Sequence, residues 1–85
     1  MRLSNAQSKL LRSGFVLDDT GDPTSELWIG ATGGRSIRLY KDGERVISLR
    51  VYGDLPDQPQ YDEFHSYYTS SAAAAIRVAL ASRRS

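Results

Sequence analysis

Alternating apolar and polar residues predict a three-stranded antiparallel meander between residues 26 and 52. Apolar side chains occupy every second position in Ile37–Leu39 and again in Leu49–Val51, which is the period of a strand with one buried face. Gly33-Gly34 and Asp42-Gly43 interrupt the pattern, and both dipeptides are typical of tight hairpin turns. We therefore expect two consecutive hairpins that share their middle strand.

The length of the second turn sets the pairing of its two strands. A two-residue loop mixes polar and apolar side chains on each face, whereas a three-residue loop of residues 41–43, closed by a left-handed Gly43, pairs Ile37 with Ile47. The longer loop gathers the apolar residues on one face: Ile37, Leu39, Ile47, Leu49 and Val51. We therefore predict the three-residue loop.

The first turn, treated in the same way, predicts the same apolar face. A loop of residues 32–34 with a left-handed Gly34 pairs Ile29 with Ile37 and Leu27 with Leu39. Side chains at the intervening positions then point to the opposite side of the sheet.

That opposite face collects large aromatic and arginine side chains: Trp28, Arg38, Tyr40, Arg50 and Tyr52. Trp28 is expected across from Arg38, where a cation–π contact stabilises the sheet by about 0.2–1 kcal/mol. The same residue types dominate the energetic centres of protein interfaces. The pattern supports two interpretations, a partner-binding surface formed by these side chains, or a solvated sheet face or second small core.

Helices are predicted at the two ends of the chain. Ser4 and Gln7 form a capping box for a helix over about residues 5–13, and Gly14 is a suitable C-terminal stop. Its apolar stripe consists of Leu3, Ala6, Leu10 and Leu11. Residues 15–17, Phe-Val-Leu, then predict a brief strand.

The C-terminal helix is predicted over residues 72–80, with Ser70 or Ser71 as its N-terminal cap. Apolar residues recur at helical spacing along it: Ala72, Ala75, Ile76, Ala79 and Leu80. Because most of these side chains are small, we expect the helix to lie close against the apolar face of the sheet.

Residues 61–69 fit two structures. Tyr61, Phe64 and Tyr68 lie at helical spacing, so the segment could extend the C-terminal helix backwards. Its aromatic and threonine content is typical of a strand, and serines that can start a helix follow it, so we predict an added strand from about Glu63 to Tyr68.

These elements predict one α+β domain over residues 1–85. We expect an antiparallel sheet of four to five strands, with the N-terminal and C-terminal helices packed on one face. A chain of 85 residues is long enough to bury one modest core.

Charged residues are segregated along the chain, although its net charge is only +1. Lys and Arg are missing from residues 13–34 and 51–76, and acidic residues fall in both stretches. The second stretch supplies a predicted secondary acidic contact site of Asp54, Asp57, Asp62 and Glu63. The near-zero net charge argues against a generic binder of polyanions.

Residue types that carry most enzyme and metal chemistry are scarce. The chain has no cysteine, and its single histidine, His65, has no recognisable triad partners. The aspartates of residues 18–22 lack the spacing of a calcium loop, and the glycine-rich residues 30–36 lack the lysine and the following helix of a phosphate loop. We therefore predict no catalytic residue, no metal site and no cofactor.

Location is predicted from two absences in the sequence. The N-terminus has no apolar signal segment, and the longest apolar run, residues 72–76, is too short to span a bilayer. We expect a cytoplasmic protein without a membrane partner.

In the order of its elements the chain resembles a double-stranded RNA-binding domain, with a helix, consecutive strands and a last helix opened by serine. That family carries a lysine cluster at the start of the last helix, where this chain has Ser70-Ser71 followed by four alanines. The resemblance implies nucleic-acid binding. The phosphate contacts would then come from Arg35, Arg38, Lys41, Arg45 and Arg50.

In its size, its lack of cysteine and its compact α+β design, the chain also resembles small proteins of phages and mobile elements that block host machinery, anti-CRISPR proteins among them. This resemblance implies a non-catalytic inhibitor or adaptor that sterically occludes a protein partner. Mixed acidic and basic patches favour a protein partner over nucleic acid. A homodimer formed through Trp28 and Tyr52 is a third hypothesis.

Overall fold

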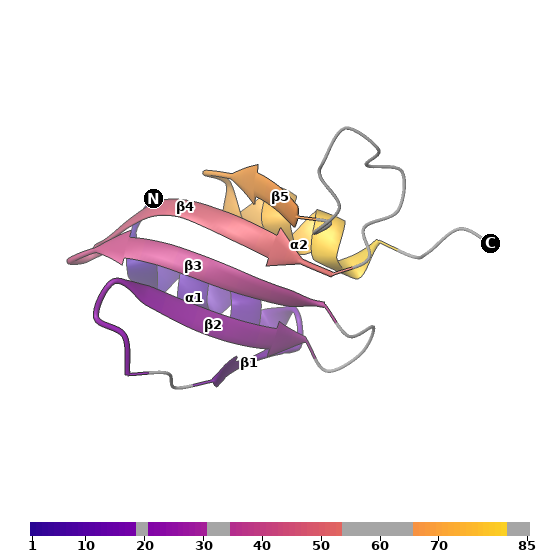
Figure 1. Cartoon of the computed structure of the whole chain (residues 1–85), viewed down its shortest axis with the longest axis horizontal. Coiled ribbons are helices and arrows are strands. Elements are labelled where there is room, and N and C mark those ends of the chain that lie inside the picture. The colour runs from indigo at the N-terminus through magenta and orange to yellow at the C-terminus, as the bar shows by residue number, and fades with distance from the viewer. Residues whose placement is uncertain (19–20, 31–34, 54–65, 82–85) are drawn as a thin grey trace.

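The computed structural model describes residues 1–18, 21–30, 35–53 and 66–81. Its elements in chain order are α1 (Leu3–Arg12), β1 (Phe15–Asp18), β2 (Ser25–Gly30), β3 (Ser36–Asp42), β4 (Arg45–Tyr52), β5 (Ser66–Thr69) and α2 (Ala72–Leu80). The strands form one antiparallel sheet in the order β1-β2-β3-β4-β5, and both helices cover the same face of it (Figure 1). The predicted α+β fold is confirmed.

The core lies between the helices and the sheet. Buried aliphatic and aromatic side chains come from every element except β5: Ala6, Leu10, Phe15, Trp28, Ile37, Leu39, Val46, Leu49, Val51, Ala72, Ala75, Ile76 and Ala79. Three alanines of α2, Ala72, Ala75 and Ala79, are buried against the sheet as expected, since a small side chain lets the helix backbone approach it. Leu11 and Leu80, which the helical stripes included, are 60% and 52% exposed.

The pairing of β3 with β4 differs from the prediction by four residues. Ile37 faces Val51 and Leu39 faces Leu49, so the expected pairing of Ile37 with Ile47 is wrong. The turn consists of two residues, Gly43 and Glu44, with Gly43 in the left-handed region at φ +63°. The register nevertheless keeps Ile37, Leu39, Leu49 and Val51 on the helix side, as predicted.

A β-bulge accompanies this short turn. Lys41 pairs with Val46 and Tyr40 pairs with Ser48, which leaves Ile47 as an extra residue in β4. The extra residue reverses the inward and outward alternation at that point. Val46 is therefore 9% exposed, whereas Ile47, predicted to be buried, is 59% exposed.

The pairing of β2 with β3 differs from the prediction by one residue. Trp28 faces Ile37 and Leu27 faces Arg38, so Trp28 lies on the helix side and is only 2% exposed. A one-residue shift moves every side chain of a strand to the other face. Ile29, expected in the core, is 42% exposed. The turn glycines of this hairpin lie outside the described residues.

A carboxylate on the helix side connects this strand to α1 and β3. Glu26 accepts hydrogen bonds from Gln7 Nε2 at 2.9 and 3.0 Å and from Trp28 Nε1 at 3.1 Å, and it pairs with Lys41 Nζ at 3.0 Å. This bond gives the indole N–H an acceptor, so burying Trp28 leaves no polar group unsatisfied. That helps to explain why Trp28, and not Ile29, enters the core. The side chain of Gln7 therefore joins α1 to β2.

The start of α1 is consequently not a capping box. The helix begins at Leu3 after Arg2, which makes no side-chain cap, and Ser4 lies within the first turn. Backbone groups of the β3–β4 hairpin take over this role, because Leu3 N–H donates to the Glu44 carbonyl at 2.8 Å. The predicted stop is confirmed, since Gly14 follows the helix at φ +92°.

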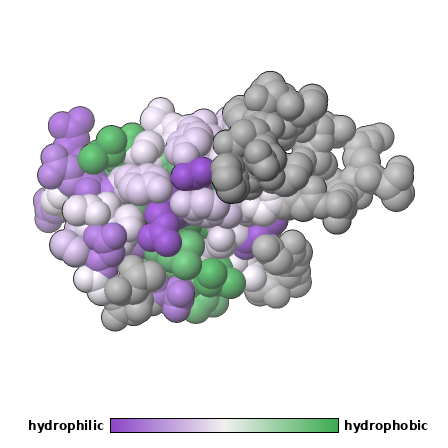
Figure 2. All heavy atoms as spheres, viewed as in Figure 1, coloured by the Kyte–Doolittle hydropathy of each residue, from purple (hydrophilic) through white to green (hydrophobic). Residues whose placement is uncertain are grey.

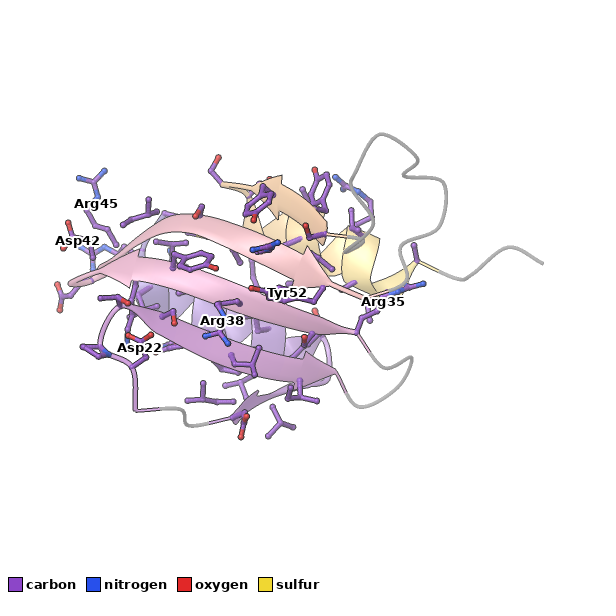
Figure 3. The ribbon with its side chains drawn as sticks, viewed as in Figure 1. Asp22, Arg35, Arg38, Asp42, Arg45 and Tyr52 are labelled. Carbon is purple, nitrogen blue, oxygen red and sulfur yellow. The ribbon has the colours of Figure 1, made fainter. Side chains whose placement is uncertain are left out.

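The second helix begins at the predicted residue, and the arginine that precedes β3 bonds to the carbonyl groups at its C-terminal end. Ser71 Oγ accepts a hydrogen bond from Ala74 N–H at 3.2 Å. Arg35, 7% exposed, donates from its NH1 group to the carbonyl of Ala79 at 3.1 Å and also to the carbonyl of Ala81. Figure 3 shows Arg35 beside the end of α2. Its bonds satisfy carbonyls that the helix itself leaves without a donor.

The strand interpretation of the aromatic segment is confirmed where the structure describes it. β5 comprises Ser66–Thr69, and Arg50 pairs with Tyr68 in the ladder between β4 and β5. The predicted beginning of this strand, residues 63–65, lies outside the described residues.

Candidate binding face on the open side of the sheet

Neither α1 nor α2 lies over the other face of the sheet, and the described side chains of that face include two groups. The first group is apolar and lies on β1 and β2: Val16, Leu27 and Ile29. The second, here called the Arg–Tyr cluster, lies on β3, β4 and β5: Arg38, Tyr40, Arg50, Tyr52 and Tyr68. Figure 2 shows this side of the molecule, with hydrophobic residues gathered over the β1–β2 part.

The Arg–Tyr cluster is organised around two arginines on neighbouring strands. Arg38 and Arg50 are direct cross-strand partners. Like charges placed opposite each other in an antiparallel pair normally destabilise the sheet. Each side chain also has a partner on an outer strand, Ser25 of β2 for Arg38 and Ser66 of β5 for Arg50.

Arg50 is held between two tyrosine rings. Its guanidinium carbon lies 4.8 Å from the ring centre of Tyr52 and 4.6 Å from that of Tyr68, and NH2 donates to Ser66 Oγ at 3.2 Å. Cation–π contacts of this kind contribute about 0.5–1 kcal/mol each at exposed sites. The arginine is therefore fixed in one orientation on the surface.

Arg38 is held by a chain of polar groups at the other side. Its NH1 group donates to Ser25 Oγ at 3.0 Å, and that hydroxyl donates to Asp22 at 3.1 Å. Thr24 donates to the same carboxylate from its backbone N–H at 2.8 Å and its hydroxyl at 2.7 Å, and these bonds lower the pKa of Asp22 below its ordinary value. In Figure 3 Arg38 lies between β3 and β2.

Two tyrosine hydroxyls connect the arginines. Tyr40 donates to the Tyr52 oxygen, and this bond, together with burial, raises the pKa of Tyr40. Burial alone would also raise the pKa of Tyr52, but the hydrogen bonds from Tyr40 and Arg38 and the charge of Arg50 outweigh it, so the pKa of Tyr52 is lowered. Arg50 in turn is hydrogen-bonded to Tyr40. The cluster is a connected network.

This network leaves positive charge without a directly bound counter-charge. Among the described residues, both guanidiniums donate to neutral hydroxyls and neither bonds directly to a carboxylate. Ser25 bridges Arg38 to Asp22, and the charge of Arg38 helps to lower the pKa of Asp22. Arg50 Nε is shielded from solvent and has no described acceptor, a condition that costs about 1–3 kcal/mol for a buried polar group. A guanidinium has five N–H donors, so both retain unused donors toward solvent.

Four of the predicted surface residues therefore lie together, namely Arg38, Tyr40, Arg50 and Tyr52, and their role in binding stays a prediction. Trp28 does not join them, because it belongs to the core. Tyr68, 54% exposed, completes the cluster and was not among the predicted residues. In the sequence, Ser66 and Tyr68 stand two residues apart, so they share a face if residues 61–69 form a strand, but the same segment also fitted a helix.

The predicted acidic contact site cannot be placed on this face. Its residues, Asp54, Asp57, Asp62 and Glu63, lie outside the described residues.

A second group of cations lies on the helix side. Lys9 and Arg12 of α1 and Arg77 of α2 line a shallow groove of about 340 Å³, together with Ser13, Ala73 and Ile76. Lys9 and Arg12 occupy the last turn of α1, where positive charge stabilises the helix dipole. Arg77 likewise occupies the last turn of α2, so a role in helix stability accounts for all three cations and the open face is the stronger candidate.

Within residues 1–18, 21–30, 35–53 and 66–81, no group of three His, Cys, Asp or Glu side chains is arranged to hold a metal ion. Neither α1 nor α2 is long and apolar enough to cross a membrane. No family model, curated protein or solved structure matches this chain.

Proposed function

We propose that this chain is a non-catalytic binding protein, a small inhibitor or adaptor that docks on a protein partner through the open face of its sheet. The observation that carries the proposal is the Arg–Tyr cluster. Its side chains are fixed before any partner arrives, they leave donors unused, and neither helix covers them. Side chains that are already ordered lose little entropy on binding.

The make-up of the face favours a protein partner over nucleic acid. Val16 and Ile29 are 62% and 42% exposed beside the cluster, so apolar and cationic surfaces adjoin, as they do in protein interfaces. Tyr52 and Tyr68 both turn toward Arg50, which competes with nucleotide bases for stacking on their rings. The net charge of +1 also gives little general attraction to a phosphate backbone.

The proposed mechanism is steric. A rigid domain that occupies a functional surface of its partner blocks that surface without chemistry, and the binding energy is concentrated in a few aromatic and arginine side chains. The resemblance to anti-CRISPR and related mobile-element proteins supports this mechanism through size and design.

Capture of partners from a host lysate tests the proposal when wild type and matched variants are compared. We expect Tyr68→Ala to weaken capture of a specific protein by tenfold or more, at roughly 1.4 kcal/mol per tenfold. Arg77→Gln is the control, because Arg77 is an exposed arginine on α2, on the other side of the sheet. Equal capture by both variants would contradict docking through the open face.

Two further measurements separate the alternatives. Sedimentation at varied concentration detects a homodimer, and a dimer lost in Tyr68→Ala would identify a second copy of this chain as the partner. A mobility shift with RNA or DNA that weakens steeply with salt and depends on Arg38 would replace the protein partner with nucleic acid.

A further inference from the structure

We propose that Arg38 and Arg50 form a receptor for two carboxylates of an acidic segment of the partner protein. This inference rests on the proposed function and names the chemistry by which the open face recognises its partner.

The positions of the two charges are the first reason. Arg38 and Arg50 are direct cross-strand partners, an arrangement that repels, and the described residues place no carboxylate in contact with either guanidinium. The fold therefore places two arginines opposite each other without a direct ion pair among the described residues, and the charge of Asp22 acts on Arg38 alone, across Ser25. An acidic ligand would remove the repulsion and gain two charge-assisted interactions at once.

The orientation of the two guanidiniums is the second reason. Arg38 is tied toward β2 by Ser25, and Arg50 is tied toward β5 by Ser66. The two therefore present separate sets of donors, which suits two carboxylates better than one. The contacts with the Tyr52 and Tyr68 rings hold the Arg50 guanidinium in one orientation, and because its Nε is shielded from solvent, a carboxylate would meet its terminal nitrogens.

The surroundings of the pair restrict what else the ligand contains. Leu27 lies directly across from Arg38 on one side, and Tyr68 lies directly across from Arg50 on the other. From β2 to β5 the row that crosses the sheet is thus apolar, cationic, cationic and aromatic, and Asp18 of β1 ends it beyond Leu27. A segment in which acidic residues alternate with apolar ones matches this row, whereas a uniformly charged phosphate backbone leaves Leu27 without a counterpart.

The glutamate requirement is tested with two synthetic peptides with blocked ends, one alternating Glu with Val and the other alternating Gln with Val. Binding is followed by NMR of the arginine side-chain Nε–Hε groups. We expect the Glu peptide to shift the signals of Arg38 and Arg50, and the Gln peptide to leave them unchanged. Arg38→Gln or Arg50→Gln should weaken binding of the Glu peptide by roughly tenfold, as for loss of one charge-assisted hydrogen bond.

Controls separate recognition from general charge and from altered folding. Arg77→Gln removes the same charge from the helix side and should change the affinity less than twofold. Arg50→Lys keeps the charge on the face but loses the fork, so it should bind more weakly than wild type while circular dichroism shows the same fold. An equal loss in Arg77→Gln, or equal binding of the Gln peptide, overturns the inference.

The remaining outcomes are also decisive. Tighter binding of single-stranded oligothymidylate than of the Glu peptide, with the same dependence on Arg38 and Arg50, would mean that the site reads phosphate and would overturn the carboxylate assignment. If Tyr68→Ala abolishes capture of a partner but the Glu peptide does not bind, this inference fails while the proposed function stands. If no open-face variant affects capture, the proposed function itself fails.

Discussion

Replacing Glu26 should destabilise the domain in proportion to the contacts that each substitution removes. The carboxylate is 11% exposed and bonds to Gln7, Trp28 and Lys41. Hydrogen bonds to a charged group contribute about 1.5–3 kcal/mol each, but Gln7 and Lys41 can turn toward water when the carboxylate is removed. Since only the indole N–H of Trp28 stays buried, we expect Glu26→Ala to lower the free energy of unfolding by about 3 kcal/mol.

Glu26→Gln keeps the size of the side chain and one carbonyl acceptor, so the expected loss is smaller, about 1 kcal/mol. For a domain of this size each kcal/mol shifts Tm by roughly 4–8 °C. Urea denaturation of wild type and both variants, followed by Trp28 fluorescence, measures these differences directly. Combining Glu26→Gln with Lys41→Met in a double-mutant cycle isolates the ion pair between the two side chains.

The pH dependence of the free energy of unfolding tests whether the charge of Glu26 stabilises the fold. Burial raises the pKa of Glu26, but bonds from Gln7, Lys41 and Trp28 outweigh it, so the folded pKa lies below the ordinary value of 4.5. The stability that ionised Glu26 contributes is therefore fully present above pH 4.5 and is lost as pH falls through the folded pKa. The gap between wild type and Glu26→Gln should close over that acidic range. A gap that stays constant from pH 7 down to pH 3 would refute a role for the charge.

Three further predictions concern other parts of the molecule. Gly53→Ala should lower the free energy of unfolding by about 2 kcal/mol in urea denaturation, because Gly53 has φ +129° and an added Cβ would lie 2.8 Å from Arg35 Cγ. Ser71→Ala removes the cap of α2 and should cost about 1 kcal/mol in the same assay, whereas Ser71→Asp should restore most of it. In a pH titration followed by NMR of the tyrosine rings, Tyr52 should ionise before Tyr40, and Arg38→Gln should raise the pKa of Tyr52. The reverse order of ionisation would contradict the described network.

The elements of the fold could be predicted because each has a local signal. Gly14 ends the first helix, Ser71 starts the last one, and strict alternation in β3 marks its buried face. These signals depend on neighbouring residues only. The choice of fold class followed from their order along the chain.

The register could not be predicted, because it depends on contacts between distant parts of the chain. Leu27, Trp28 and Ile29 are three consecutive apolar residues, so the pattern alone allows either face to be buried. Glu26 decides the matter by giving the indole N–H a partner on the helix side. At the other hairpin, the bulge at Ile47 changes the alternation of buried and exposed residues within β4, and no local residue preference predicts it.

Part of the candidate site was nevertheless predicted correctly, because a wrong register changes the face of a side chain only when the shift is an odd number of residues. A shift of four residues between β3 and β4 is even, so Arg38, Tyr40, Arg50 and Tyr52 stayed on one face. The shift of one residue in β2 is odd, and it exchanged Trp28 for Leu27 on that face.

The short outer strands of the meander affect how this molecule can associate with others. β1 and β5 contain only four residues each, and they form the two edges of the sheet. Such short edges offer few free backbone groups for another chain to extend the sheet, which limits polymerisation by strand addition. Because side chains, and not backbone, would then determine the partner, specificity could be changed by surface substitutions alone. The described framework of helices and strands is in this sense a scaffold on which new binding faces can be built.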